Sequence, residues 1–550
     1  MGQFTMLEWG HLTIAKALKE AAEKWGSKEA LLSKNERLTY SELYQKACQL
    51  ARAFTKVGIK KGDHVATIFG TVPEWVITQY ALHIIGAVIV PVNVNFKAKE
   101  IEFVLKQADV KTLITVDKLR IGNYLEILAD IDREILLGKE KKIHSKALPS
   151  LERIICFSPD KNKFPNCYDF TEVMDSGRNF QIKEIEKLQE MVRPDDICNI
   201  LFTSGSTSFP KGAVHVQTSL LGIGMYLWGK TFNLNPTHRL LCYFPFYHIA
   251  GVVYFTLGAL TNGCALYVNE FNPDEILPII QNENINFYCG FEYHFNALAN
   301  HPKFSNYNLT SVSRILLAAG PEWYDKCQKI FPGAEIIANH YGFTEGTGVS
   351  VMPSEDDYQV RKYTNGKPWA GIEVKVVDPL TGKRVAPNEG GELCLKGWSR
   401  FREYYKNAEE TKRAVDSDGY FHSGDYGWMD EKGNVTYRGR YKMMIKSGGE
   451  NVSEREVEVF LETIPGIKSV QVLGVPDPNW GEAVTAIIEL ESGTNLTKES
   501  VIDFCKNKMA RFKIPKNVLF IDGKDWPLLG SGKVNKIQLK EWAKKKLGLH

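Results

Sequence analysis

The sequence predicts an α/β protein with three parts: a large N-terminal domain of stacked, mostly parallel sheets covered by helices, a β-rich subdomain, and a small α+β C-terminal domain. Helix and strand patterns alternate through most of the chain. Gly-rich, turn-rich β segments run from about 358 to 437, and a new mixture of helix and strand patterns follows residue 442. A chain of 550 residues is also too long for one ordinary core. We therefore expect an N-terminal domain at 1–440 and a C-terminal domain at 441–550.

The alternation begins with a helix that opens on a capping-box pattern, Thr39 with Glu42, and closes on Gly58. A second helix begins at Pro73, a residue suited to the first helical turn. Around these two helices we expect strands at 64–70, 87–93 and 110–117 and a further helix at 98–109. Such alternation predicts parallel sheets with helices on both faces.

Three more short apolar strands, each ending on Gly, are expected at 284–290, 313–320 and 334–342. Ligands of open parallel sheets gather beyond the carboxyl ends of the strands. The residues that end these three strands are therefore candidates for a binding site.

The run from Leu240 to Asn269 carries no charged residue and is long enough to cross a membrane. However, Pro245, Gly251 and Gly258 interrupt it, so we expect a loop, a buried helix of about a dozen residues and a strand instead of a transmembrane segment. The N-terminus lacks the basic and apolar regions of an export signal, so we expect none.

The C-terminal domain is expected to begin with a helix that Ser453 and Glu456 cap. Strands at 469–475 and 483–490 and a helix near 498–508 follow. The segment as a whole predicts a small, separate α+β unit on a short linker.

The composition is that of an ordinary globular protein, with a formal net charge of only +3. This balance gives no sign of a surface for nucleic acid. The ten cysteines are scattered singly without a CxxC pair, which argues against a zinc site or a disulfide framework. Such cysteine usage fits a reducing compartment, so we expect a cytoplasmic protein.

The stretch Thr203–Ser208 consists of five hydroxyl residues and one glycine, and Lys211 follows shortly after it. Hydroxyls, backbone N–H groups and a lysine together suit an oxyanion such as a nucleotide phosphate, although the same residue types also make ordinary turns. The loop is not a Walker motif, because Lys211 is followed by Gly212 where Ser or Thr is required.

Seven motifs in a fixed order carry a family resemblance. They are TSGSTSFPKG (203–212), YGFTEG (341–346), GELCLKG (391–397), HSGDYGWMDEKGNVTYRGR (422–440), IKSGGENVSEREVE (445–458), GVPDPNWGE (474–482) and GSGKVNK (530–536). The chain resembles the adenylate-forming superfamily of acyl-CoA synthetases, peptide-synthetase adenylation domains and beetle luciferases. Its pattern is closest to ligases of medium-chain or cyclic carboxylates. Ser208, Met443 and Lys536 depart from the usual pattern.

The resemblance implies an acid:CoA ligase that uses ATP, Mg²⁺ and CoA and has a mobile C-terminal domain. A carboxylate attacks the α-phosphate of ATP to give acyl-AMP and pyrophosphate, and the thiol of CoA then displaces AMP. The partners implied are a small carboxylic acid, ATP and CoA, without nucleic acid, and a homodimer is possible. Three alternatives stay open: loading of a carrier protein, a luciferase-like oxidase, and a non-catalytic binding protein.

The resemblance also assigns residues to the first half-reaction. Thr344 would contact the α-phosphate, Glu345 would hold Mg²⁺, Lys533 would be the catalytic cation, and His248 would be an aromatic gate between ATP and the acid. Phosphates would lie on Thr203, Ser204, Gly205, Ser206, Thr207 and Lys211, the ribose on Asp425 and Arg440, and the adenine on Asn339, His340 and Tyr341.

For the second half-reaction the resemblance implies rotation of the C-terminal domain about a hinge at Lys442. This rotation would bring Lys446, Ser447, Gly448 and Gly449 to the CoA channel. The acid pocket is expected between 221–229, 245–252 and 318–323. Tyr226, Trp228, Phe246 and Tyr247 are core residues by default, and any of them that line the pocket would suit an apolar acyl group of limited length.

Overall fold

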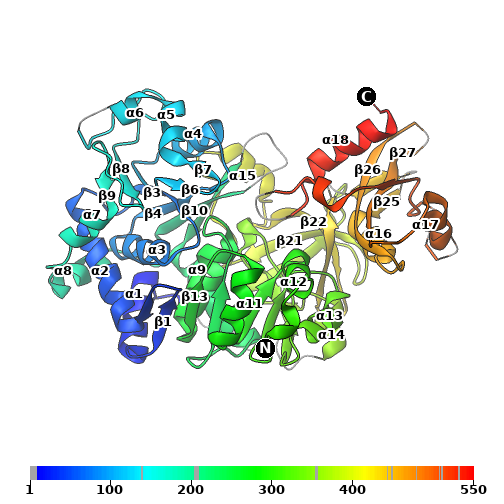
Figure 1. The fold of residues 1–550 in the computed structure, drawn as a ribbon, viewed down its shortest axis with the longest axis horizontal. Helices are drawn as coiled ribbons and strands as arrows, with labels where there is room; N and C mark the ends of the chain where they lie inside the picture. The colour runs from blue at the N-terminus through cyan, green and yellow to red at the C-terminus, as the bar shows by residue number, and fades with distance from the viewer. Residues whose placement is uncertain are drawn as a thin grey trace.

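The computed structural model describes residues 9–137, 140–203, 210–352, 357–441, 444–447, 450–478, 480–506, 508–509, 512–529 and 533–549. These residues form the predicted α/β fold, with two large sheets, helices around them and smaller β units toward the C-terminal half (Figure 1). The chain ends in a smaller unit, drawn in orange and red at the right of Figure 1.

The first seven-stranded sheet has the order β11-β10-β4-β3-β5-β8-β9. All neighbours in it are parallel except β10 and β11, which form an antiparallel pair. The predicted strands at 64–70, 87–93 and 110–117 are confirmed as β3, β4 and β5. The strand bounds are β3 His64–Ile68, β4 Val88–Pro91, β5 Thr112–Val116, β8 Arg153–Phe157, β9 Tyr168–Asp169, β10 Ile197–Thr203 and β11 Lys211–Val216.

The second seven-stranded sheet has the order β16-β15-β14-β12-β13-β1-β2, and only β1 and β2 pair antiparallel. The predicted strands at 284–290 and 313–320 are confirmed as β14 and β15. The bounds are β1 Glu29–Leu32, β2 Arg37–Thr39, β12 Arg239–Cys242, β13 Ala265–Val268, β14 Phe287–Gly290, β15 Arg314–Leu317 and β16 Ile336–Ala338.

The single strand predicted at 334–342 is in fact two strands in different sheets. β16 ends at Ala338, and β17, His340–Tyr341, pairs with β18, Ser350–Val351. Between them the side chain of Asn339 accepts a hydrogen bond from the backbone N–H of His340 at 2.7 Å. This local bond replaces a ladder bond and lets the chain leave the large sheet.

Helices cover the sheets and begin where the sequence predicts. Thr39 and Glu42 form the capping box of α2, and α3 begins at Pro73 and ends on Gly86, whose φ of 72° is left-handed. The helices of this part are α1 Ile14–Trp25, α2 Tyr40–Lys56, α3 Pro73–Ile85, α4 Ala98–Gln107, α5 Tyr124–Ile131, α6 Glu134–Leu137, α7 Phe170–Ser176, α8 Ile182–Glu190, α9 Gln217–Ile223, α10 Thr256–Asn262, α11 Pro273–Asn282, α12 Glu292–Ala299 and α13 Trp323–Ile330.

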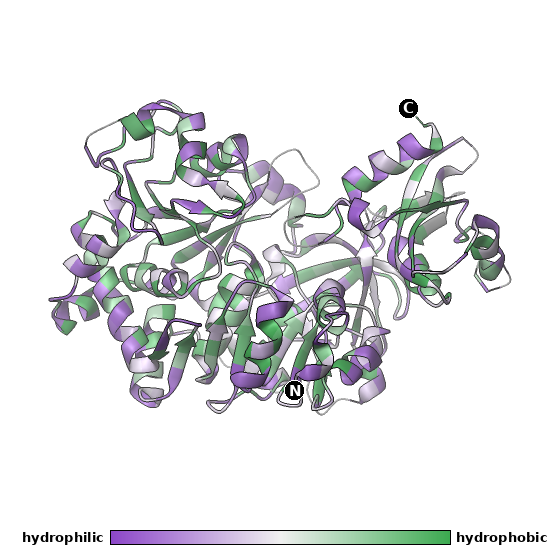
Figure 2. Cartoon of the chain, in the orientation of Figure 1, coloured by the Kyte–Doolittle hydropathy of each residue, from purple (hydrophilic) through white to green (hydrophobic). Residues whose placement is uncertain are grey.

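The uncharged run from Leu240 to Asn269 begins within strand β12 and continues as a loop, a helix and strand β13. Its helix starts as a π-helix, η2 (Ala250–Phe255), and continues as α10. Among the described residues, no helix is long and apolar enough to cross a membrane. Most residues of the run are buried, and Figure 2 shows that hydrophobic residues concentrate in the interior strands and helices of the molecule.

The β-rich subdomain contains two smaller sheets that follow the large ones. The order β17-β18-β19 forms a three-stranded sheet and β20-β21-β22-β23 a four-stranded antiparallel sheet. The bounds are β19 Lys367–Pro368, β20 Ile372–Val377, β21 Gly391–Gly397, β22 Phe421–Met429 and β23 Val435–Arg440, with helices α14 Tyr358–Tyr363 and α15 Ala408–Ala414 beside them and a small hairpin of β6 Lys118–Leu119 and β7 Gly122–Asn123 elsewhere. Of the remaining short helices, η1 Gly224–Thr231 and η3 Phe304–Asn306 lie, like η2, among the elements of the large sheets, and η4 Thr344–Gly346 lies between β17 and β18.

The C-terminal unit has its own sheet, β25-β24-β27-β26 with β28 beside β27, and its own apolar clusters. The predicted strands at 469–475 and 483–490 lie within β26 and β27, whereas the helix predicted to 508 ends at Cys505. The capping of α16 by Ser453 lies outside the described side chains. The bounds are β24 Met444–Ser447, β25 Glu450–Ser453, α16 Glu454–Leu461, β26 Ile467–Asp477, β27 Gly481–Leu490, α17 Lys498–Cys505, β28 Asn517–Phe520, η6 Gly523–Asp525 and α18 Lys536–Leu547.

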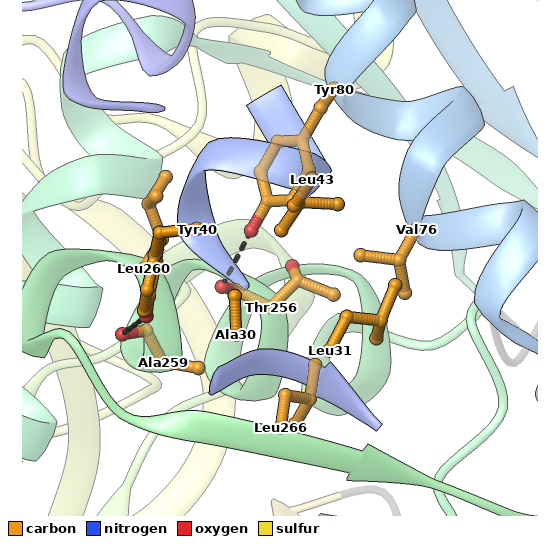
Figure 3. A pocket seen from close by; sticks show the side chains of 10 residues that line it. All are labelled: Ala30, Leu31, Tyr40, Leu43, Val76, Tyr80, Thr256, Ala259, Leu260 and Leu266. Atoms are coloured by element: carbon orange, nitrogen blue, oxygen red, sulfur yellow. Dashed lines mark hydrogen bonds between the residues drawn. The ribbon is translucent and has the colours of Figure 1, made fainter. Parts of the chain in front are cut away.

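A small cavity lies between α2, α3, α10 and the edge of the second large sheet (Figure 3). Its volume of about 10 Å³ is close to the least that one water molecule needs. The hydroxyl groups at its wall are already satisfied, because Tyr40 donates to the carbonyl of Ala259 at 2.9 Å and Tyr80 to that of Thr256 at 3.0 Å. None of the predicted site residues lines it, so we regard it as a packing defect.

Candidate active site

The predicted phosphate loop connects two paired strands. Thr203 ends β10 and lies opposite Lys211, the first residue of β11, so the antiparallel pair brings the two ends of the loop together. Ser204, Gly205, Ser206 and Thr207 lie outside the described residues. The structure therefore gives the anchors of the loop and the position of its lysine.

Lys211 has contacts that the sequence analysis did not identify. Its ammonium pairs with the carboxylate of Glu410 on α15 and lies 5.3 Å from the ring centre of Tyr404. Glu410 follows Lys211 by 199 residues, and no local sequence pattern signals such a pair.

The same tyrosine reaches the predicted metal ligand. The hydroxyl of Tyr404 donates to Oε1 of Glu345 at 2.8 Å, and the carbonyl of Glu345 accepts from the N–H of Phe401 at 2.6 Å. Burial and the charge of Glu345 raise the pKa of Tyr404, so its phenol stays a donor. Thr344 and Glu345 lie on η4, and the residue after η4, Thr347, has the unusual φ of 23°. The hydroxyl of Thr347 holds this turn by donating to the carbonyl of Ser399 at 2.8 Å.

Asp425 is buried, with 2% of its surface exposed, and is held from several sides. Nε of Arg440 lies 2.8 Å from one carboxylate oxygen, and the hydroxyl of Tyr341 donates to the other at 2.7 Å. The backbone N–H of Asp425 donates to the hydroxyl of Ser423 at 3.0 Å. Burial, opposed by Arg440 and Tyr341, raises the pKa of Asp425 to about 6. The structure thus brings Asp425, Arg440 and Tyr341 together.

A second layer holds the turn that carries Asp425. One oxygen of Glu392 accepts from the N–H of Gly424 at 2.9 Å, and the other lies 2.8 Å from Nδ1 of His422. Gly424 needs its missing side chain, since its φ is +70°. Contacts with the thiol of Cys394 and with Glu392 raise the pKa of His422 to about 10, so this histidine is charged at neutral pH. Glu392 and His422 stand inside two of the recognised motifs, but the sequence analysis assigned neither a role.

The three residues predicted to face adenine have different surroundings. Tyr341 is 5% exposed and its ring stacks on that of Tyr437, with centroids 5.4 Å apart. Nε2 of His340 lies 3.1 Å from the hydroxyl of Tyr254, and burial lowers the pKa of His340 to about 4, so it is neutral at neutral pH. The side-chain amide of Asn339 donates to the carbonyl of Ala319 at 3.4 Å.

Lys533 of the C-terminal unit lies beside residues of the N-terminal part. Its ammonium lies 3.9 Å from the ring centre of Phe291, directly after strand β14, and desolvation lowers its pKa. Burial and then the charge of Lys533 lower the pKa of His248 to about 4. The same two causes lower the pKa of His294 to about 3. Lys533 thus contacts Phe291 of the N-terminal part, and its charge acts on both His248 and His294.

The residues predicted to serve CoA are described only in part. Ser447 ends β24, is fully buried, and lies opposite Gly481 of β27. Its hydroxyl has no hydrogen-bond partner in the part of the chain that the structure describes. The backbone of Lys446 lies in β24, whereas its side chain and the residues Lys442, Met443, Gly448 and Gly449 lie outside the described structure.

Two of the four aromatic residues considered for an acid pocket are core residues. Phe246 stacks on Trp75 with centroids 4.3 Å apart, and Trp228 packs edge-on against Phe287 at 4.4 Å. Tyr226 and Tyr247 are only partly buried. Tyr226 lies beside Trp9 and Trp398, and the hydroxyl of Tyr247 accepts from the side chain of Asn95 at 3.2 Å.

Comparison with known proteins finds similar enzymes over nearly the whole length of the chain. A model of the AMP-binding enzymes matches residues 18–405, and a model of the AMP-binding enzyme C-terminal domain matches residues 456–533. A Bacillus subtilis protein described as an acyl-CoA synthetase, YngI, is 32% identical over 98% of both chains. The human mitochondrial medium-chain acyl-CoA ligase ACSF2 is 30% identical over 98% of this chain and 88% of its own.

Two further proteins extend the comparison. A Rhodococcus jostii CoA ligase for 3-[(3aS,4S,7aS)-7a-methyl-1,5-dioxo-octahydro-1H-inden-4-yl]propanoate is 29% identical over 96% of this chain and 98% of its own. The anthranilate CoA ligase AuaEII, solved with anthranoyl-AMP, superposes with a TM-score of 0.84 over 98% of both chains. Its 21% identity supports a common fold and no more.

Proposed function

We propose, on the premise that this chain belongs to the family of AMP-binding enzymes and is an AMP-forming acyl-CoA synthetase, that it joins an apolar carboxylic acid to coenzyme A in two half-reactions. The acid first attacks the α-phosphate of ATP, giving acyl-AMP and pyrophosphate. The thiol of CoA then displaces AMP and forms the thioester. The contact of Lys533 with Phe291 carries this proposal, because it joins the C-terminal unit to the end of strand β14, where ligands gather.

The first half-reaction needs positive charge where two anions meet. We assign the phosphates to Thr203, Ser204, Gly205, Ser206, Thr207 and Lys211, and the contact between carboxylate and α-phosphate to Lys533 and Thr344. The lowered pKa of Lys533 favours release of its proton, but near the anions of ATP the ammonium form is stabilised. His248 would then separate the acid from ATP.

The nucleotide itself is assigned to the buried carboxylate and its neighbours. Asp425 would accept hydrogen bonds from the ribose hydroxyls, and Arg440 would bind ribose and phosphate. Asn339, His340 and Tyr341 would line the adenine, with Tyr341 acting mainly through its bond to Asp425.

Mg²⁺ fits Glu345 as a ligand, because a hard cation bridging phosphates usually takes only one or two protein carboxylates. Glu345 is only partly buried and is oriented by Tyr404. When bound there, Mg²⁺ supplies Lewis-acid stabilisation to the phosphate oxygens.

For the second half-reaction we propose a hinge at Lys442, at the boundary between domains 1–440 and 441–550. Rotation would withdraw Lys533 and bring Lys446, Ser447, Gly448 and Gly449 to CoA. Lys442→Pro should leave acyl-AMP formation largely intact and suppress thioester formation at least tenfold, because proline fixes φ at the hinge. Single-turnover rates of the two half-reactions test this, and equal losses in both would contradict it.

The acid is proposed to be a medium-chain, aryl or alicyclic carboxylate. Of the four aromatic residues considered for the pocket, Tyr226 and Tyr247 are the two that are only partly buried. The names of two relatives point in the same direction, since one activates medium-chain acids and the other a propanoate on a fused ring system.

The test is acid-dependent exchange of labelled pyrophosphate into ATP over a panel of such acids, repeated with CoA to detect AMP and thioester. Exchange with consumption of CoA supports the proposal. Exchange without consumption of CoA supports loading of a carrier protein, and oxygen uptake in place of thioester formation supports an oxidase. Failure of every acid supports a binding protein.

We also propose a cytoplasmic location and a homodimer. All ten cysteines are free and buried, which fits a reducing compartment. Light scattering of the purified protein tests the dimer, and fractionation of cells tests the location.

A further inference from the structure

Arg455 pairs with carboxylates of both the C-terminal unit and the N-terminal part. Arg455 lies on α16, and its Nη2 is 2.6 Å from Oε1 of Glu292 at the start of α12 and 2.5 Å from Oε1 of Glu322, next to α13. Nη1 lies 3.1 Å from Glu462 and 3.5 Å from Glu458, both of the C-terminal unit. One guanidinium thus lies among four carboxylates, two from each side.

The contact adjoins the place where Lys533 enters the candidate site. Phe291, whose ring lies under the ammonium of Lys533, is the residue before Glu292. The orientation of the C-terminal unit that brings Lys533 to Phe291 therefore also brings Arg455 to Glu292. A rotation that withdraws Lys533 has to break the Arg455 pairs as well.

Arg455 supplies the positive charge that lies directly between the carboxylates of Glu292 and Glu322 and those of Glu458 and Glu462. Burial raises the pKa of Glu292 and that of Glu462, the latter to about 7, and Arg455 opposes both shifts. Glu458 has a second cation, because Nζ of Lys536 lies 2.8 Å away. Two cations of the N-terminal side also face the group. Lys326 interacts with Glu292, and Arg438 interacts with Glu456 of the C-terminal unit and with Glu322. Without Arg455, carboxylates of the two units would face one another and repel.

We propose that Arg455 is a positioning residue for acyl-AMP formation: an ionic latch that holds the C-terminal domain with Lys533 in the site and opens before the thioester forms. The proposal rests on the two half-reactions proposed above. Arg455 acts through Lys533 and contacts neither ATP nor the acid. Arg455 meets Glu292 and Glu322 only in the orientation that places Lys533 in the site. The latch therefore favours acyl-AMP formation and not thioester formation.

The test compares Arg455→Gln with the unchanged enzyme in two single-turnover assays. Formation of acyl-AMP from ATP and acid should slow by about tenfold, the change expected when one partly exposed pair is lost and like charges remain. Thioester formation from synthetic acyl-AMP and CoA should be as fast as before or faster. Further replacement of Glu292 and Glu322 by Gln removes the repulsion and should recover part of the first rate.

Lys468→Gln is the matched control, because Lys468 pairs with Glu489 at 2.6 Å wholly inside the C-terminal unit. It should change neither half-reaction. Equal slowing of both half-reactions by Arg455→Gln, an equal effect of Lys468→Gln, or no effect at all would overturn the latch.

A measurement without turnover separates the latch from the proposed function. Spin labels at the exposed positions Lys99 and Lys545, each changed to Cys, report the distance between the two units with ATP bound. Arg455→Gln should broaden this distance distribution, and Lys468→Gln should not. An unchanged distribution would overturn the latch, whereas failure of every acid in the exchange assay would overturn only the proposed reaction.

Discussion

Asp425, assigned to the ribose, and Lys533, assigned to catalysis, differ in how firmly the structure fixes their side chains. Asp425 is fixed inside one part of the chain by Tyr341, Ser423 and Arg440, with Glu392 holding the adjacent glycine. Lys533 belongs to the C-terminal unit and contacts the other part through the ring of Phe291. A preformed carboxylate suits binding of the ground state, whereas a movable cation suits a contact needed only during reaction. Binding and catalysis should therefore be separable by mutation.

The largest effect is expected from Lys533→Ala, which removes the movable cation. Acyl-AMP formation should slow by about 10² to 10⁴, the scale for loss of one preorganised charge-stabilising donor. ATP binding should change little. Thioester formation from synthetic acyl-AMP should stay near the original rate. Single-turnover assays of both half-reactions measure this, and a parallel loss in both would show that Lys533 is structural.

Asp425→Ala tests the preformed side of the comparison. Hydrogen bonds to a charged acceptor contribute roughly 1.5 to 3 kcal/mol each, so loss of the two ribose bonds should weaken ATP binding more than tenfold. Equilibrium binding of ATP to the unreacted enzyme is the measurement. Lys533→Ala serves as its control, since that variant should bind ATP almost normally. An unchanged affinity in Asp425→Ala would remove this residue from the site.

The pH dependence of ATP binding follows from the same carboxyl group. Because burial raises the pKa of Asp425 to about 6, the carboxylate is protonated as pH falls through 6, and ATP affinity should fall with it. The stability of the free protein should respond in the opposite direction. A folded-state pKa above the ordinary 3.8 means that the folded protein holds the proton more tightly, so this group's contribution declines as pH rises from about 4 to 6. Binding curves and thermal unfolding between pH 4 and 8 test both trends, and Asp425→Asn should abolish them.

Glu410→Gln should give the smallest effect and tests the phosphate end of the site. Lys211 pairs with Glu410 where we expect it to meet phosphate, so ATP has to replace this partner. Exposed or half-exposed ion pairs contribute about 1 kcal/mol or less. ATP no longer has to break the Lys211–Glu410 pair in Glu410→Gln, so this variant should bind ATP up to about fivefold more tightly. Glu409→Gln, which alters the adjacent exposed carboxylate, is the control. Weaker binding of ATP to Glu410→Gln would show that Glu410 supports the cradle and does not compete with phosphate.

The sequence by itself determined the features that depend on near neighbours. The capping box of Thr39 and Glu42, the helix start at Pro73 and most strands follow from bonds and periodicities within a few residues, and the structure confirms them. The motifs also identified Asp425, Arg440 and Tyr341, which the structure brings together.

Contacts between residues that are far apart in the sequence were known only from the tertiary structure. The pair of Lys211 with Glu410 spans 199 residues and that of Arg455 with Glu292 spans 163, and charged residues are too common for a sequence to reveal which of them meet. The division of the strand at Asn339, and the difference between the buried Trp228 and Phe246 and the partly buried Tyr226 and Tyr247, likewise depend on which sheet or ring lies alongside. Hydrogen bonds and periodicity act along the chain, whereas partners across the fold are set by how whole elements pack.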